Sequence, residues 1–230
     1  MSPTRFVKAG GALVVLAVLV AAAMLSSTRV ARAVDDDDNG RDESRVRRGF
    51  EIAPVPLNLA GKNPELVGLG SYIVNAQIPC NDCHDAGPPT QFAKGGNPFM
   101  GQPTKINTAT YLGGGRDFGA YPTPTSPLHI ISRNLTPDKT GMPEGGRPFS
   151  EFLTIMRTGA DLDHLHPNCS AMVTTNCLQP PFRGDLLQIM PSFEFQNMTE
   201  HDLRAIYEYL SAIPCIEGPP APSPLHNDCR

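Results

Sequence analysis

The clearest chemical pattern in the chain is five consecutive residues, Cys80-Asn81-Asp82-Cys83-His84. Two thiols separated by two residues can form thioether links to the two vinyl groups of one haem, and a histidine directly after them can ligate the iron. Covalent links also prevent loss of the cofactor. The spacing therefore predicts one covalently bound haem c, attached through Cys80 and Cys83, with His84 as an axial ligand.

Three other interpretations of the cysteine pair are weaker. In a haem-free, thioredoxin-like thiol oxidoreductase the cysteine pair would lie next to a βαβ unit, and the sequence shows no such pattern. A zinc site would need His164 and His166 as further ligands, but their separation from the cysteines exceeds the common zinc spacings. A disulfide between Cys80 and Cys83 would be strained. We interpret the Asp161–His166 stretch as a polar loop.

The second axial ligand has to come from elsewhere in the chain. Six methionines follow His84, namely Met100, Met142, Met156, Met172, Met190 and Met198. Met156 and Met198 fall on predicted packing positions. Met190 is the best placed, because Pro191 would stiffen the loop that presents its sulfur just before a helix. Each of the remaining three is the next candidate should Met190 fail.

Three predicted helices surround these residues and make the chain mainly α. Pro64–Ala76 follows an N-cap at Asn63, has one apolar stripe and leads into the cysteine pair. Pro148–Thr158 has apolar residues at i, i+3, i+4 and i+7. Glu200–Ala212 begins with capping-box spacing at Thr199 and repeats the apolar stripe.

The segment between the first two helices is dominated by residues that break regular structure. The chain contains 21 Gly and 24 Pro, no Trp and only 7% aromatics, and many of the glycines and prolines fall in Asp85–Arg147. A structureless segment of this length is uncommon in a compact domain. We expect a buried haem to supply the large apolar surface on which these loops pack.

The N-terminus, Met1–Ala33, is typical of a secretory signal. Arg5 and Lys8 precede the apolar run Ala9–Leu25, and Ala31-Arg32-Ala33 is a cleavage site of A-x-A type. Cleavage would remove four basic residues and no acids, so the formal charge would fall from −4 to −8. That balance argues against a nucleic-acid partner. We expect an exported, periplasmic protein; an uncleaved signal that tethers it to the membrane is the alternative.

The exported chain is predicted to have three parts. Residues 34–60 form an acidic arm, with the block Asp35–Asp38, followed by an extended strap over Gly49–Ala60. Residues 61–216 form the main domain, and residues 217–230 form a proline-rich tail.

Four cysteines remain after the haem pair, and they permit three disulfide pairings. We favour the nearest-neighbour choice, Cys169–Cys177 and Cys215–Cys229. Each bond would close a short loop and contribute about 2–3 kcal/mol by constraining the unfolded chain. An oxidising compartment favours such bonds over reactive or metal-binding thiols.

The chain resembles class I monohaem cytochromes c over about Asn63–Pro214. The segments that resemble this family are Asn63–His84, Ile131–Asp138, Ser150–Gly159 and Ile189–Pro214. The resemblance implies a cytochrome c fold over residues 61–216, with Met190 as the distal ligand. The N-L-T-P-D segment and the helix that ends in R-T-G are similar to cytochrome subunits or domains that serve bacterial alcohol and sugar dehydrogenases.

Several other residues have predicted roles around the haem. The resemblance implies that Asn134 and Thr136 donate hydrogen bonds near it. Arg116 and Arg133 suit pairing with haem propionates, although solvated surface arginines are an equal alternative. Gly113-Gly114-Gly115 lacks the Lys-Ser/Thr of a phosphate loop.

These features together predict an electron-transfer protein rather than an enzyme. An iron with His and Met ligands has no open position for a substrate, and it gains and loses one electron with little movement. We expect redox partners such as a dehydrogenase or a terminal oxidase, with peripheral membrane association through a complex. The alternatives are a peroxidase-like haem enzyme and a fixed electron-transfer subunit of a dehydrogenase complex.

Overall fold

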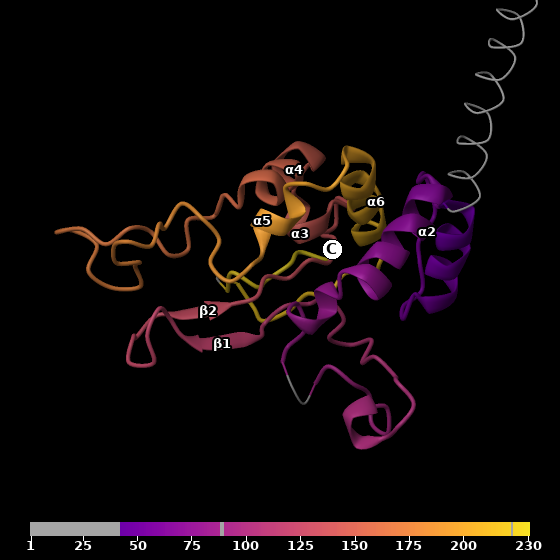
Figure 1. Cartoon of the computed structure of the whole chain (residues 1–230), viewed down its shortest axis with the longest axis horizontal. Coiled ribbons are helices and arrows are strands. Elements are labelled where there is room, and N and C mark those ends of the chain that lie inside the picture. The colour runs from indigo at the N-terminus through magenta and orange to yellow at the C-terminus, as the bar shows by residue number, and fades with distance from the viewer. Residues whose placement is uncertain (1–41, 88–89, 222) are drawn as a thin grey trace, which may run out of the picture. The chain divides into compact units, whose positions relative to one another are not determined.

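The computed structural model describes residues 42–87, 90–221 and 223–230 (Figure 1). The predicted signal and the block Asp35–Asp38 lie outside the described residues. The chain divides into two units, Met1–Ser44 and Arg45–Arg230, and the elements discussed below belong to the second. This unit is mainly helical, as the sequence predicts.

The first predicted helix is present and precedes the cysteine pair. It is α2 (Pro64–Tyr72), and the Asn63 side chain caps it by accepting a hydrogen bond from the Glu65 backbone N–H at 2.9 Å. The chain then continues through a π-helical turn, Ile73–Gln77, to a short 3₁₀ turn, Cys80–Asp82. The chain therefore reaches the Cys80–His84 motif within eight residues of the end of α2.

The other two predicted helices are also confirmed. Helix α4 (Phe149–Thr158) ends at Gly159, whose φ of 70° suits a residue without a side chain. Helix α6 (Glu200–Leu210) begins at Thr199, whose hydroxyl accepts from the Asp202 backbone N–H at 3.0 Å. A four-residue helix, α3 (Pro143–Gly146), precedes α4. Another four-residue helix, α5 (Ser192–Phe195), lies between α4 and α6.

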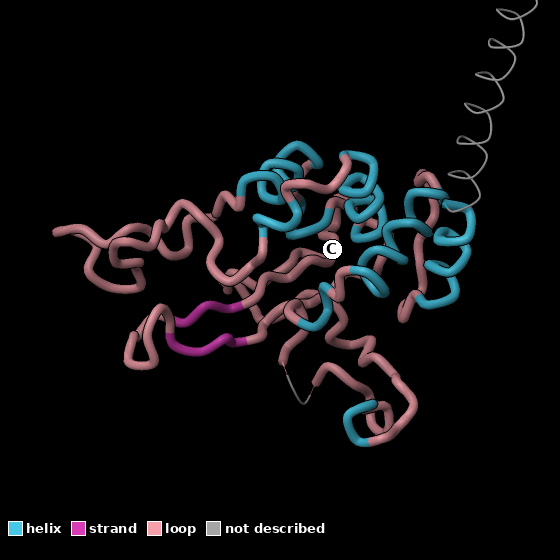
Figure 2. Tube along the Cα trace, in the orientation of Figure 1, coloured by secondary structure: helices cyan, strands magenta, loops and turns pink. Residues whose placement is uncertain are grey.

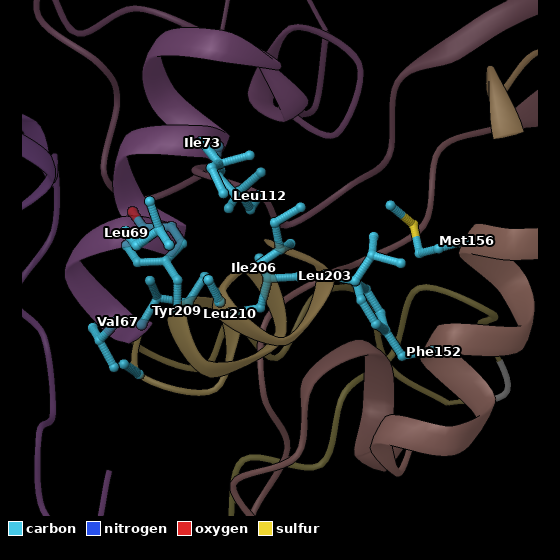
Figure 3. Close-up of a cluster of buried hydrophobic side chains, with 14 of the residues drawn as sticks. Val67, Leu69, Ile73, Leu112, Phe152, Met156, Leu203, Ile206, Tyr209 and Leu210 are labelled. Atoms are coloured by element: carbon cyan, nitrogen blue, oxygen red, sulfur yellow. The ribbon is translucent and has the colours of Figure 1, made fainter. Parts of the chain in front are cut away.

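The main core lies where α2 packs on α6 (Figure 3). Buried apolar side chains come from both helices, from the π-helical turn, from α4 and α5 and from loops, and they include Val67, Leu69, Ile73, Leu112, Phe152, Met156, Leu203, Ile206 and Leu210. The two helices approach closely at Gly70, where an added Cβ would lie 1.9 Å from the Ala205 carbonyl oxygen. Only glycine permits this approach.

Residues 45–52 are helical, where the sequence predicted a solvated arm and the start of an extended strap. A Cβ added to Gly49 would lie 1.8 Å from the Gly68 carbonyl oxygen, and the buried Ser71 hydroxyl donates to the Gly49 carbonyl at 2.7 Å. Two facing glycines thus seat this helix on α2, with the apolar side chains of Val46 and Phe50 beside them, each 2.7 Å from the position of a Cβ on Gly68. Residues 53–60 do form a strap, and the Asn58 N–H donates to the Ala212 carbonyl at 2.8 Å.

The glycine- and proline-rich middle of the chain is mostly loop (Figure 2), as predicted, but it also contains a hairpin. Strands β1 (Asp117–Ala120) and β2 (His129–Ile131) pair antiparallel with an irregular register. The hairpin buries Leu128 and Ile130 against Leu178 of the inserted loop, which forms a second, small apolar cluster. The strands are too short for a clear alternating pattern, so the sequence did not predict them.

Both predicted disulfides are present, Cys169–Cys177 and Cys215–Cys229, with Cα–Cα separations of 4.9 and 5.7 Å. The first closes the tip of the inserted loop, and the second closes the C-terminal tail. Within the described ranges, no helix is both long enough and apolar enough to cross a membrane.

The α2–α6 contact makes Gly70→Ala a sensitive test of the fold. The new methyl group would meet the backbone of α6, which cannot move aside as a flexible side chain can, so we expect a loss of about 3 kcal/mol in the free energy of unfolding. Urea denaturation measures this loss. Gly61→Ala is the control, because its methyl group meets nothing within 4 Å and only its φ of 72° costs about 1 kcal/mol. Equal losses in the two variants would contradict the close contact.

Candidate functional site

The five motif residues are held in one tight turn after α2. The backbone N–H groups of Cys83 and His84 both donate to the Cys80 carbonyl, at 3.1 and 2.9 Å. Cys80 and Cys83 are unpaired, whereas the other four cysteines form disulfides. The turn therefore presents two reduced thiols and an imidazole from nearby positions. No disulfide joins Cys80 to Cys83.

The His84 ring has one nitrogen engaged and one left for a ligand. Nδ1 lies 2.9 Å from the Arg133 carbonyl oxygen, and because a carbonyl only accepts, Nδ1 carries the proton. Among the described residues, no hydrogen bond engages Nε2. Burial lowers the pKa of His84, which favours the neutral ring. A neutral imidazole that donates through one nitrogen to a backbone carbonyl is the arrangement that proteins use for metal-binding histidines.

Two loop segments enclose His84. The Gly114 N–H donates to the His84 carbonyl at 2.9 Å, and the 112–115 and 132–135 segments pair through the Gly115 N–H to the Ser132 carbonyl, also at 2.9 Å. Gly114 has a φ of 67°, and a Cβ there would lie 2.4 Å from the Arg133 carbonyl. The backbone at Gly114 thus lies very close to the backbone of Arg133, beside His84.

The two predicted propionate-pairing arginines have different surroundings. The Arg116 guanidinium donates to the Asp82 carbonyl, and its positive charge opposes the effect of burial on the Cys83 pKa. It lies beside the motif. Arg133 is largely buried, and its guanidinium pairs with the carboxylates of Asp161, at 2.5 Å, and Asp163. Two carboxylates therefore already occupy Arg133, which leaves Arg116 as the better placed of the pair.

Asn134 and Thr136 are both buried, and their side chains contact the C-terminal tail. The Asn134 amide donates to the Ile216 carbonyl at 2.7 Å and accepts from the Thr136 hydroxyl at 2.7 Å. Sequence reasoning gave no role to Asn227, which binds Thr136 from the tail. Hydrogen bonding to a haem remains a prediction for Asn134 and Thr136, but the structure gives both a second role that no local sequence signal indicates.

Met190 lies in the turn before α5 and packs, partly buried, against the main core, as Cys80 does. The Ser192 N–H donates to the Met190 carbonyl at 2.8 Å, and Ile189 has a positive φ of 72°, so the backbone of this turn is tightly folded. Met156 is in the core, as predicted. In contrast, Met100 and Met172 are 71% and 96% exposed, respectively, which makes them poor ligand candidates.

A buried polar network lies next to the motif and was not predicted. The Tyr111 hydroxyl lies 2.6 Å from Asn75 Oδ1, to which it donates, and 2.8 Å from the Tyr209 hydroxyl. Burial raises the pKa of both tyrosines, and Cys80 is close enough to add to that effect. The network ties α6 and the 110–112 turn to the last turn of the helix that leads to Cys80.

The residues present fit a covalently bound haem. Two reduced thiols and a free imidazole nitrogen are the donors that haem c requires. Two buried polar atoms beside them, Asn81 Nδ2 and Asp85 Oδ2, have no partner within the described part of the chain. A haem propionate would accept from Asn81 Nδ2, whereas Asp85 Oδ2 is itself an acceptor and needs a donor other than the haem.

No cluster of three or more His, Cys, Asp or Glu side chains within the described ranges is arranged to hold a metal ion, so His164 and His166 do not join the cysteine pair. Comparison with known proteins gives no match to any family model, curated protein or solved structure. The assignment of the site therefore depends on the motif and its geometry.

The two motif thiols should differ in reactivity in protein made without haem attachment. Burial raises the pKa of Cys80 to about 12, whereas Cys83 is exposed and Arg116 partly offsets the rise in its pKa. At pH 8 we expect iodoacetamide to modify Cys83 well before Cys80, because the thiolate is the reactive form. Peptide mass spectrometry measures the order, with Cys80→Ser and Cys83→Ser as single-thiol controls. Equal rates in the folded protein would contradict the burial of Cys80.

Proposed function

We propose that this protein is a monohaem cytochrome c that transfers single electrons. Cys80 and Cys83 would hold the haem, and His84 and Met190 would be its axial ligands, in a cytochrome c fold over residues 61–216. The observation that supports this most strongly is the His84 ring, whose Nδ1 donates to the Arg133 carbonyl while Nε2 remains available beside two unpaired thiols. When bound, haem c supplies a one-electron ferric/ferrous couple.

The chain's own residues would set how the site works. The Arg133 carbonyl fixes the orientation and tautomer of His84, and the paired loop segments hold that carbonyl in place. The folded turn of Met190 would present a second ligand, so no open position would remain for a substrate. Methionine ligation favours the reduced state and raises the potential. These features favour an electron carrier over a peroxidase-like enzyme.

The partners and location follow from charge and the export signal. Removal of residues 1–33 would leave a formal charge of −8, so the protein would associate with basic surfaces on its partners, and high salt would weaken docking. We propose a periplasmic location with a dehydrogenase as electron donor or a terminal oxidase as acceptor. Salt-dependent binding to a candidate dehydrogenase, measured by calorimetry, tests this proposal.

Absorption spectra of protein matured in a host that attaches haem c would test both the cofactor and the ligand. We expect a covalent c-type spectrum that survives denaturation, and a sulfur-to-iron charge-transfer band in the oxidised form. Met190→Ala should abolish this band and allow the reduced protein to bind carbon monoxide, because it opens the sixth position. Met172→Ala is the matched control, since its side chain is 96% exposed and its loss should change neither property.

Three results would contradict this proposal at different points. A wild-type protein without covalent haem would refute the cofactor. A Met190→Ala spectrum identical to wild type would refute only the ligand, and a wild-type protein that already binds carbon monoxide rapidly would favour a haem enzyme.

A further inference from the structure

The C-terminal tail has one fully buried polar side chain, Asn227, which is only 1% exposed. Its Nδ2 donates to the Thr136 and Pro137 carbonyls, both at 2.9 Å, and lies 3.2 Å from the Thr136 hydroxyl. Its own backbone N–H donates to the Glu217 carbonyl at 2.8 Å. The side-chain amide thus joins the tail to the loop that follows β2, and the backbone N–H of the same residue joins two parts of the tail.

The contacts of Asn227 continue to the residue beside the His84 acceptor. The Thr136 hydroxyl accepts from the Ile216 N–H at 3.0 Å and donates to Asn134 Oδ1 at 2.7 Å. The Asn134 amide in turn donates to the Ile216 carbonyl at 2.7 Å. Asn134 directly follows Arg133, whose carbonyl oxygen accepts a hydrogen bond from His84 Nδ1.

The loop over residues 133–137 is held at its two ends by different contacts. It contains no helix or strand, and in its middle the Leu135 N–H donates to the Leu112 carbonyl at 2.9 Å while the Leu135 carbonyl accepts from the Glu144 N–H at 3.4 Å. The tail itself is closed by the Cys215–Cys229 disulfide, so its position is constrained at both ends. The paired 112–115 segment and the Asp161 and Asp163 carboxylates hold the loop at Arg133, whereas the tail side chains hold its far end at Thr136 and Pro137.

We propose that Asn227 is a positioning residue for the axial histidine: by holding Thr136 and Pro137, it fixes the loop that directs the Arg133 carbonyl at His84. The inference rests on the proposed function for its redox consequence. A hydrogen bond from Nδ1 to a carbonyl makes the other nitrogen a stronger donor to a metal, and this stabilises the oxidised state. If the loop loosens, the bond weakens and the potential rises.

The test compares the reduction potential of haem-loaded variants. Asn227→Ala should shift the equilibrium about threefold toward the reduced form, which is roughly 28 mV on a scale of about 59 mV per tenfold for one electron. The His84 Nδ1 proton, followed by NMR on ¹⁵N-histidine protein, should exchange faster with solvent. Asp228→Asn is the control, because it removes an exposed ion pair between the tail and Lys139 and no contact to residues 133–137.

A second pair of variants covers the case in which Asn227→Ala does not fold. Thr136→Val has the same shape but lacks the hydroxyl that joins Asn227, Asn134 and Ile216, so it should raise the potential as well. Thr136→Ser keeps the hydroxyl and should restore the wild-type potential and exchange rate.

The outcomes separate this inference from the proposed function. An unmutated protein without covalent haem refutes both. A haem-loaded Asn227→Ala protein that melts at a lower temperature, but whose potential and His84 proton exchange match wild type, shows that Asn227 only stabilises the tail. The same potential in Thr136→Val and Thr136→Ser would also overturn the positioning role.

Discussion

The close contact between α2 and α6 at Gly70 is the constraint on which the rest of the structure depends. A glycine on one helix lies against the Ala205 carbonyl of the other, so the two axes approach more closely than any larger side chain would allow. This fixes the direction in which the chain leaves α2. The π-helical turn Ile73–Gln77 then brings Cys80 to the edge of the core, beside the buried Tyr111–Tyr209 pair.

Around the Cys80–His84 turn, the loops form backbone hydrogen bonds with one another. Buried backbone groups need partners, and a loop cannot supply them from within as a helix does. Here the glycine run at 113–115 pairs with the 132–135 segment, and the tail supplies amide groups to Thr136 and Pro137. At Gly114 the lack of a side chain permits a close backbone approach beside His84, whereas Gly95, Gly101, Gly119 and Gly141 have open space around them and allow turns with a positive φ.

Features that depend on neighbours in the sequence were predicted correctly. The caps at Asn63 and Thr199, the three helices and the two short-range disulfides all appear in the structure. The solvated arm and the start of the strap predicted over residues 45–52 were wrong, because a charge-rich sequence was interpreted as solvated although Gly49, Val46 and Phe50 pack a helix against Gly68 of α2. The β1–β2 hairpin was missed because its strands are too short to show alternation.

The sequence by itself determined the chemistry on offer: two thiols and an imidazole at a spacing that suits haem c, and a set of methionines from which a ligand could come. Only the tertiary structure decided which groups are available. The bond that leaves Nε2 of His84 available comes from a carbonyl 49 residues away, and Asn227 reaches Thr136 across 91 residues. Periodicity and capping arise between residues a few positions apart, so they indicate helices, but partners that meet only on folding leave no local pattern.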